Sequence, residues 1–251
     1  MPLPHIRTGI AELDVALGTE CPGFPRGALT LICGGVGTGK STLVRHLAHY
    51  AATIGHQRVL FCDAEGNPPG RHSSLIREVG VDGPVDVVPG SYTSPFDYQQ
   101  PSDLVGLFNA IRASVHLYDL IIADAVSVLG LPPTPGQAPQ IAARSRFLGS
   151  AIQGLRLENC ALVMVFQSPR SGPLDRGVNS QLVTHHARLI LDLSGFTEGV
   201  YSAHIAKATW PVQDEEFGFR YGGPSQVIAV PKAKPIDRSK IPTRFNREDP
   251  L

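Results

Sequence analysis

Residues 28–54 read ALTLICGGVGTGKSTLVRHLAHYAATI, and they predict a strand, a glycine-rich loop and a helix in direct succession. The run from Ala28 to Cys33 is short and apolar, as expected for a buried strand. The segment from Ser41 to Ile54 has the length and amphipathic character of a helix. Similar apolar runs alternate with helix-length segments further along the chain, which is typical of crossover units on a mainly parallel sheet. The sequence therefore predicts an α/β fold.

The loop between this strand and this helix matches Gly-x-x-x-x-Gly-Lys-[Ser/Thr], a motif whose glycines let backbone N–H groups turn inward around a β-phosphate. The helix N-terminus adds its positive end. We expect Lys40 to reach the β- and γ-phosphates and Ser41 to offer its hydroxyl to Mg²⁺. The alternative is a glycine-rich turn that binds nothing, but the strand-to-helix context favours a nucleotide site. The predicted nucleotide-binding residues are Gly34, Gly35, Val36, Gly37, Thr38, Gly39, Lys40, Ser41 and Thr42.

Acidic residues that follow two other predicted strands are candidates to complete this site. Asp124 closes the strand Leu120 to Ala123, where a carboxylate can hold the Mg²⁺ shell; without the loop it would be interpreted as a helix cap. Glu65 follows the strand Arg58 to Cys62 and is the best-placed general base for attack on a γ-phosphate, with Asp63 as the second choice. An Asp-x-Glu at a loop entry is otherwise more often a solvated turn. Because parallel strands bring their carboxyl ends to one edge, we expect these groups to converge.

The rest of the chain shows two different sequence patterns, one before and one after residue 187. Further strands are predicted at 85–88 and 162–166, and further helices at 73–79, 102–116 and 141–157. After residue 187, strand-like segments at 188–193, 200–206 and 216–221 are joined by short turns and indicate antiparallel strands that extend the sheet. We predict one core, residues 1–222, and a basic, proline-containing tail, residues 223–251.

Composition narrows the class of protein. Lys plus Arg and Asp plus Glu number 22 each among 251 residues, so net charge gives no sign of a polyanion-binding protein. The four cysteines form no Cys-x-x-Cys pair, which favours reduced thiols and a cytoplasmic location over disulfides or a zinc site. The N-terminus has no signal-peptide pattern, and the longest apolar stretches are too short for a membrane span.

Several stretches together resemble the ATPase core of the RecA/RadA recombinase superfamily: TGIAELD at 8–14, FPRGALT at 24–30, the phosphate loop, DAEG at 63–66, LIIAD at 120–124, FQ at 166–167 and residues 207–222. The resemblance implies a RecA-type P-loop NTPase core, with a mainly parallel twisted sheet, helices on both faces and C-terminal antiparallel strands. It also implies ATP and Mg²⁺ as ligands and ATP hydrolysis, stimulated by DNA, as the activity.

The resemblance further implies roles for single residues. Glu65 corresponds to the glutamate that activates the attacking water, and Lys40 and Gln167 complete the expected catalytic set, Gln167 as the γ-phosphate sensor that relays to a DNA loop. Arg71 lies near the position of the adenine-stacking residue. Lys207 corresponds to the lysine segment that caps the nucleotide of a neighbouring subunit, which implies self-association.

Two segments, residues 131–139 and 168–180, correspond to the DNA-binding loops of the family. Their basic residues are Arg144 and Arg146 after the first and Arg170 and Arg176 within the second. A DNA groove normally carries denser Lys and Arg, so any one of these is as readily interpreted as a solvated surface charge. The expected ligand is single-stranded DNA, in recombination or repair.

Two departures from the family pattern favour its short, core-only relatives, such as archaeal RadB or recombinase paralogues. The phosphate-binding fold begins almost at once, without the N-terminal segment that locks filament subunits together, and Ala125 stands where the family usually has Ser. His185 and His186 stand where some members carry a histidine near the γ-phosphate, or are ordinary strand residues. The alternatives are a non-filamenting paralogue or mediator that uses ATP as a conformational ligand, and a KaiC-like regulatory ATPase without DNA.

Overall fold

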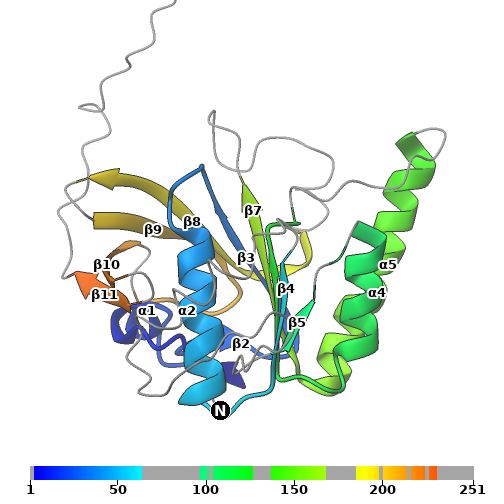
Figure 1. The fold of residues 1–251 in the computed structure, drawn as a ribbon, viewed down its shortest axis with the longest axis horizontal. Helices are drawn as coiled ribbons and strands as arrows, with labels where there is room; N and C mark the ends of the chain where they lie inside the picture. Colours follow the sequence, from blue (N-terminus) through cyan, green and yellow to red (C-terminus); the bar gives the residue numbers. More distant parts are fainter. Residues whose placement is uncertain are drawn as a thin grey trace, which may run out of the picture.

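A computed structural model describes residues 3–63, 97–99, 101, 104–126, 137–167, 185–197, 200–213, 216–223 and 226–230. Its helices are α1 (Ala11–Ala16), α2 (Lys40–Thr53), α4 (Leu104–Ser114) and α5 (Gln137–Glu158). Its strands are β1 (His5–Ile6), β2 (Phe24–Pro25), β3 (Ala28–Gly34), β4 (Val59–Asp63), β5 (Asp97–Gln99), β6 (Leu120–Asp124), β7 (Ala161–Gln167), β8 (Ala187–Thr197), β9 (Val200–Ala208), β10 (Glu216–Gly223) and β11 (Gln226–Val230) (Figure 1).

The described strands form a nine-stranded sheet in the order β11-β10-β9-β8-β3-β7-β6-β4-β5, beside a small β1–β2 pair. The strands from β8 through β5 are all joined in parallel, whereas β9, β10 and β11 follow as antiparallel neighbours. We call the edge where β3, β4, β6, β7 and β8 end the phosphate edge, and the edge where they begin the far edge. The order places β3, which leads into the glycine-rich loop, between β7 and β8.

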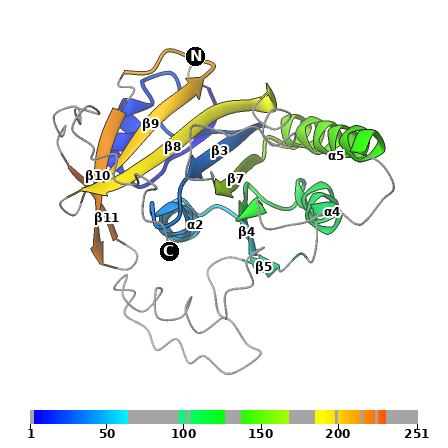
Figure 2. The same ribbon diagram turned by 90° about the horizontal axis from the view of Figure 1, so that it is seen from above.

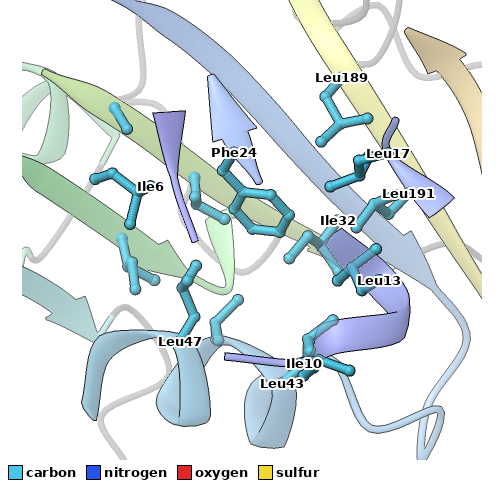
Figure 3. Close-up of a cluster of buried hydrophobic side chains, with 14 of the residues drawn as sticks. Ile6, Ile10, Leu13, Leu17, Phe24, Ile32, Leu43, Leu47, Leu189 and Leu191 are labelled. Atoms are coloured by element: carbon cyan, nitrogen blue, oxygen red, sulfur yellow. The ribbon is translucent and has the colours of Figure 1, made fainter. Parts of the chain in front are cut away.

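Each central strand sends alternate side chains to opposite faces of the sheet, and both faces are covered. Helix α2 lies on one face, and α4 and α5 lie together on the other (Figures 1 and 2). Ile32 of β3 packs with Leu43 and Leu47 of α2 in a cluster that also takes in α1 (Figure 3). Leu31, the neighbour of Ile32, packs instead with residues of α4 and α5. Strands that are apolar up to their last residue, such as β6, are therefore expected, because a parallel sheet is buried on both sides.

The predicted fold class is confirmed. The predicted strands that begin at Ala28, Arg58, Leu120 and Leu162 appear as β3, β4, β6 and β7, and the three segments after residue 187 appear as β8, β9 and β10. The predicted strand at 85–88 and helix at 73–79 lie outside the described residues. Strand β11 lies beyond residue 222, where the sequence predicts the core to end; residues 231–251 are not among those described.

Short elements at the N-terminal end escaped prediction because two-residue strands show no periodicity. The pair β1–β2 aligns His5 with Pro25 and Ile6 with Phe24, which buries Ile6 and Phe24 against the α2 face. Asp14 ties helix α1 to the segment just before it, because its carboxylate accepts hydrogen bonds from both the amide and the hydroxyl of Thr8, at 2.9 and 2.8 Å. None of the helices in the described part of the chain is long and apolar enough to cross a membrane.

Candidate nucleotide-binding site

The glycine-rich loop leaves the sheet at Gly34 and enters α2 at Gly39, and both positions have backbone angles that favour glycine. Gly34 has φ of 151°, and a Cβ there would lie 2.4 Å from the carbonyl oxygen of Leu193 on the neighbouring β8. Gly39 is the N-cap of α2 with φ of 83°, in the left-handed region. The loop therefore turns tightly at the phosphate edge and delivers the amide groups of the α2 N-terminus to it.

Two side chains fold back onto the loop itself. The Lys40 ammonium donates a hydrogen bond to the Gly35 carbonyl oxygen at 2.6 Å, and the Thr38 hydroxyl donates to the same oxygen at 2.9 Å. Lys40 is 8% exposed, so its charge sits within the loop rather than in bulk solvent. Val36, at the outer side of the loop, is 71% exposed. The loop thus holds one cation at the first residue of a helix, where anions are already favoured.

The carboxylate predicted for this site does reach it. Ser41 Oγ donates a hydrogen bond to Oδ1 of Asp124 at 3.2 Å, which joins α2 to the end of β6. Asp63, at the end of β4, aligns in register with Asp124, and both carboxyl side chains are almost fully buried. Buried carboxylates are costly unless they have partners, and these two lie side by side at the phosphate edge.

Two further polar residues share the phosphate edge. Gln167 ends β7, aligns with Gly34 in register and is exposed. Asp192 on β8 aligns with Cys33, the residue before Gly34. Sequence reasoning missed Asp192; the signal was an acidic residue inside the apolar run RLILDL, which only the parallel pairing of β8 with β3 places beside the loop.

This set of groups fits a Mg²⁺-bound triphosphate. A lysine ammonium and a helix N-terminus are donors for phosphate oxygens, and a hydroxyl beside a buried carboxylate matches the hard oxygen ligands that Mg²⁺ takes together with phosphate and water. The described residues contain no cluster of three or more His, Cys, Asp or Glu side chains.

Comparisons with known proteins agree with this geometry. The protein RecA of Streptomyces venezuelae is 33% identical over 128 residues, which are 51% of this chain and 30% of that protein. RecA of Streptomyces coelicolor matches to the same extent. A crystal structure of the RadB recombinase superposes with a TM-score of 0.65 at 20% identity and covers 90% of this chain and 100% of that one. This chain has a RecA/RadA-type core.

The match to the RecA proteins concerns only part of them, because this chain aligns with 30% of their length. The likeness to RadB is a likeness of fold. No protein-family model matches the chain. The predicted resemblance to the RecA/RadA superfamily is thus confirmed for the core, and the activity of the whole protein is taken up as a proposal below.

Lys207 does not join the phosphate edge of this RecA/RadA-type core. It lies on strand β9 and aligns with Ile190 of the antiparallel strand β8. Its ammonium donates a hydrogen bond to the carbonyl oxygen of His185, which precedes β8, at 3.3 Å. His185 and His186 precede Ala187, which aligns with Leu29 near the start of β3. At about 3.3 Å per strand residue, these groups lie on the order of 20 Å from the phosphate loop of the same molecule.

Other predicted site residues lie outside the described part of the core. These are Glu65, Arg71, Arg170 and Arg176. Arg144 and Arg146 belong to helix α5, but their side chains are not described. Thr42 lies in the first turn of α2. The roles given to all of these residues therefore stay predictions.

Proposed function

We propose that this protein binds Mg²⁺-ATP at the phosphate edge and hydrolyses it. The observation that carries the proposal is the hydrogen bond between Ser41 and Asp124, because it brings a carboxylate from a distant part of the chain to the hydroxyl next to Lys40. A strand-to-helix turn with no ligand would require neither group. The sequence similarity to RecA proteins supports the proposal independently of this hydrogen bond.

Each residue has a defined part in the proposed reaction. The α2 amides and Lys40 hold the phosphates and offset the charge that develops on the terminal phosphoryl group. Ser41 would ligate Mg²⁺, and Asp124 would hold the water shell of the ion; the ion supplies charge neutralisation between the β- and γ-phosphates. We propose Glu65, two residues after buried Asp63, as the base that orients the attacking water. Gln167 would contact the γ-phosphate.

The test measures ATP binding and hydrolysis separately. Lys40→Ala should abolish both, whereas Glu65→Gln should keep binding and lose turnover, because only the first removes a phosphate ligand. Val15→Ser, at a 54% exposed position of α1, is the matched control and should behave as wild type. Equal binding and equal turnover in all four proteins would show that the site assignment is wrong.

We further propose that single-stranded DNA is the effector of this activity, through the segments that contain Arg144, Arg146, Arg170 and Arg176. The proposal rests on the family resemblance. It predicts that single-stranded DNA raises turnover and that replacing all four arginines with glutamine removes the stimulation while basal turnover persists. DNA binding should weaken steeply as salt rises, because phosphate contacts release counterions. Absence of DNA binding at low salt would contradict the proposed role of DNA and leave the proposed ATP hydrolysis untouched.

A second candidate is a RadB-like accessory protein that uses ATP as a conformational ligand and acts with a recombinase. The position of Lys207 favours it. If this lysine caps a nucleotide, the nucleotide must belong to another molecule, either a second copy or a recombinase partner, because its ammonium lies at the far edge. ATP binding without measurable turnover, unchanged by Glu65→Gln, would favour this candidate over the ATPase.

A further inference from the structure

The tip of the glycine-rich loop has little side-chain packing of its own. Val36 is 71% exposed, and a Cβ added to Gly37 would meet nothing within 4 Å. Val36 also stands between two glycines, Gly35 and Gly37, which widen the range of backbone angles open to this stretch. Because packing does not fix the tip, the orientation of its peptide groups depends on hydrogen bonds.

One carbonyl oxygen of this tip accepts hydrogen bonds from two side chains. The Thr38 hydroxyl donates to the Gly35 carbonyl oxygen at 2.9 Å, and the Lys40 ammonium donates to the same oxygen at 2.6 Å. Thr38 and Lys40 are each 8% exposed, so bulk water competes little for these bonds. The Gly35 carbonyl oxygen therefore links the hydroxyl of Thr38 to the ammonium of Lys40.

The side chain of Thr38 lies against the start of the loop. A Cβ on Gly34 would lie 2.7 Å from Thr38 Oγ1, and a Cβ on Gly35 would lie 3.8 Å from its methyl carbon Cγ2. A β-branched side chain such as threonine has few accessible χ1 rotamers. The hydroxyl is thus directed at the Gly35 carbonyl oxygen by a stiff side chain that spans the loop from Thr38 back to Gly34.

The direction of this carbonyl matters for a loop that binds phosphate. Such a loop turns its N–H groups toward the anion, whereas a carbonyl oxygen turned the same way would repel phosphate oxygens. The bond from Thr38 keeps the Gly35 oxygen directed into the loop, and the same oxygen holds the ammonium of Lys40. Loss of the hydroxyl would let the Gly35 peptide group rotate and would shift the ammonium that is bonded to it.

From this shared oxygen we propose that Thr38 is a positioning residue, which acts through the Gly35 carbonyl to hold the Lys40 ammonium where it favours a nucleoside triphosphate over a diphosphate. The inference rests on the proposed function, in which Lys40 contacts both the β- and the γ-phosphate. A displaced ammonium loses a charge-assisted hydrogen bond to the γ-phosphate, which only the triphosphate has. The affinity for ATP should therefore depend on Thr38 more than the affinity for ADP does.

The test is calorimetric titration of the full chain with ATP and with ADP, each in Mg²⁺, so it does not require turnover. Thr38→Val removes the hydroxyl and nearly keeps the shape of the side chain. We expect it to weaken ATP binding about tenfold and ADP binding by no more than about threefold, because a lost hydrogen bond has an effect of this order. Thr38→Ser keeps the hydroxyl and should bind both nucleotides within about twofold of wild type.

A matched control makes the reverse exchange of the same two side chains. Val15→Thr adds a hydroxyl at a 54% exposed position of α1 and should bind ATP and ADP as wild type does. Urea unfolding of each variant checks that it folds and that its free energy of unfolding stays close to that of wild type. Recovery of ATP binding in Thr38→Ser then assigns the effect to the hydroxyl and not to the shape of the side chain.

Three results would overturn the proposed role of Thr38. Equal losses of ATP and ADP affinity in Thr38→Val would mean that Thr38 supports the whole loop and not Lys40. Unchanged ATP affinity in Thr38→Val, or Thr38→Ser as weak as Thr38→Val, would also contradict it. Lys40→Ala separates this inference from the proposed function. If Lys40→Ala loses ATP while Thr38→Val keeps it, only the role of Thr38 is wrong; if Lys40→Ala binds ATP as wild type does, both are wrong.

Discussion

The phosphate edge and the far edge belong to the same strands, yet they handle charge in opposite ways. At the phosphate edge, Lys40 and Ser41 at the start of α2 meet the loop and the end of β6, through hydrogen bonds to the Gly35 carbonyl oxygen and to Asp124. At the far edge, Asp119 is shared by Arg26 and Arg58 in an ion-pair group that ties several strand starts. The first edge joins the loop and a helix start to one strand end, whereas the second joins the starts of several strands through ion pairs.

This contrast has a geometric origin in the parallel sheet. The strands enter helices from the phosphate edge, so helix N-termini such as that of α2 gather there with their unsatisfied amides. At the far edge, helices α4 and α5 end and the chain returns to a strand within a few residues. Ligand binding should therefore be sensitive to substitutions at the first edge, and stability to substitutions at the second.

The largest effect is expected at Gly34, where a side chain has no room. Gly34→Ala should cost about 3 kcal/mol or more in the free energy of unfolding and should abolish nucleotide binding, because its Cβ would meet the Leu193 carbonyl oxygen. Urea unfolding measures the cost. Gly37→Ala is the control: its φ of 75° is unfavourable, but nothing lies within 4 Å of the added Cβ, so about 1 kcal/mol is expected. Similar costs at both positions would show that Gly34 does not lie as close to the Leu193 carbonyl oxygen as the structure places it.

The second expectation separates metal from phosphate binding at the phosphate edge. Ser41→Ala should weaken ATP binding about tenfold to a hundredfold in Mg²⁺ and leave binding in EDTA unchanged, because the hydroxyl is predicted to ligate the ion. Calorimetric titration with and without EDTA measures both. An equal loss in the two conditions would mean that Ser41 holds phosphate or the loop and not the metal.

The third expectation concerns stability at the far edge. Burial raises the pKa of Asp119, but hydrogen bonds from the Arg58 amide and the Arg26 side chain, with the charges of both arginines, outweigh it, so the pKa lies below its usual value. Asp119→Asn should therefore cost about 1 kcal/mol at pH 7. A carboxylate with a lowered pKa stabilises the fold above its unfolded pKa of about 3.9, and this is lost as pH falls through the folded pKa.

Unfolding midpoints of wild type and Asp119→Asn, measured from pH 7 to pH 3, check this sign. The two should converge as the pH falls below about 4. Nucleotide binding should be unchanged at pH 7, because Asp119 lies at the far edge. A gap that widens toward low pH would contradict the assignment of the ion pair.

The smallest effect is expected at His186, whose pKa is lowered by burial and by the charges of His185, Arg156 and Lys207. Arg156→Gln and Lys207→Gln should each raise the pKa of His186 toward its ordinary value, because each removes a positive charge that now lowers it. NMR titration of the imidazole resonances measures the shift, and Arg58→Gln serves as the control. An unchanged His186 pKa in both variants would mean that Arg156 and Lys207 lie too far from the imidazole to act on it.

Long, strongly patterned elements were predictable from the sequence because their evidence is local. Strand β3, the loop and α2 follow from residues 28–54 alone, and β6 followed from one apolar run. The two-residue strands β1 and β2 were not predictable, since Pro25 argues against a strand and pairing with His5 is what defines it. Strand β11 likewise depends on its pairing with β10.

The candidate site shows the same division between local and distant information. The phosphate loop was recognisable at once, because eight consecutive residues specify it. The approach of Asp124 to Ser41 was expected from the rule for parallel strands, but Asp192 was overlooked because its neighbour Cys33 lies far away in the sequence. The position of Lys207 and His185 at the far edge was not predicted, since the sequence singled out both for roles at a nucleotide and their place depends on the pairing of β8 with β3 and β9.

The sequence by itself determined the strand–loop–helix unit, because neighbouring residues specify its local backbone geometry, and it predicted both the phosphate-binding role of the loop and the resemblance of the core to the RecA/RadA superfamily. Only the tertiary structure decided how the far edge is arranged: that Asp119 is shared by two arginines, and that the Lys207 ammonium lies away from the phosphate edge of its own molecule. The reason is physical. Strand order and register bring together groups that are far apart in the chain, and only the whole sheet sets that order.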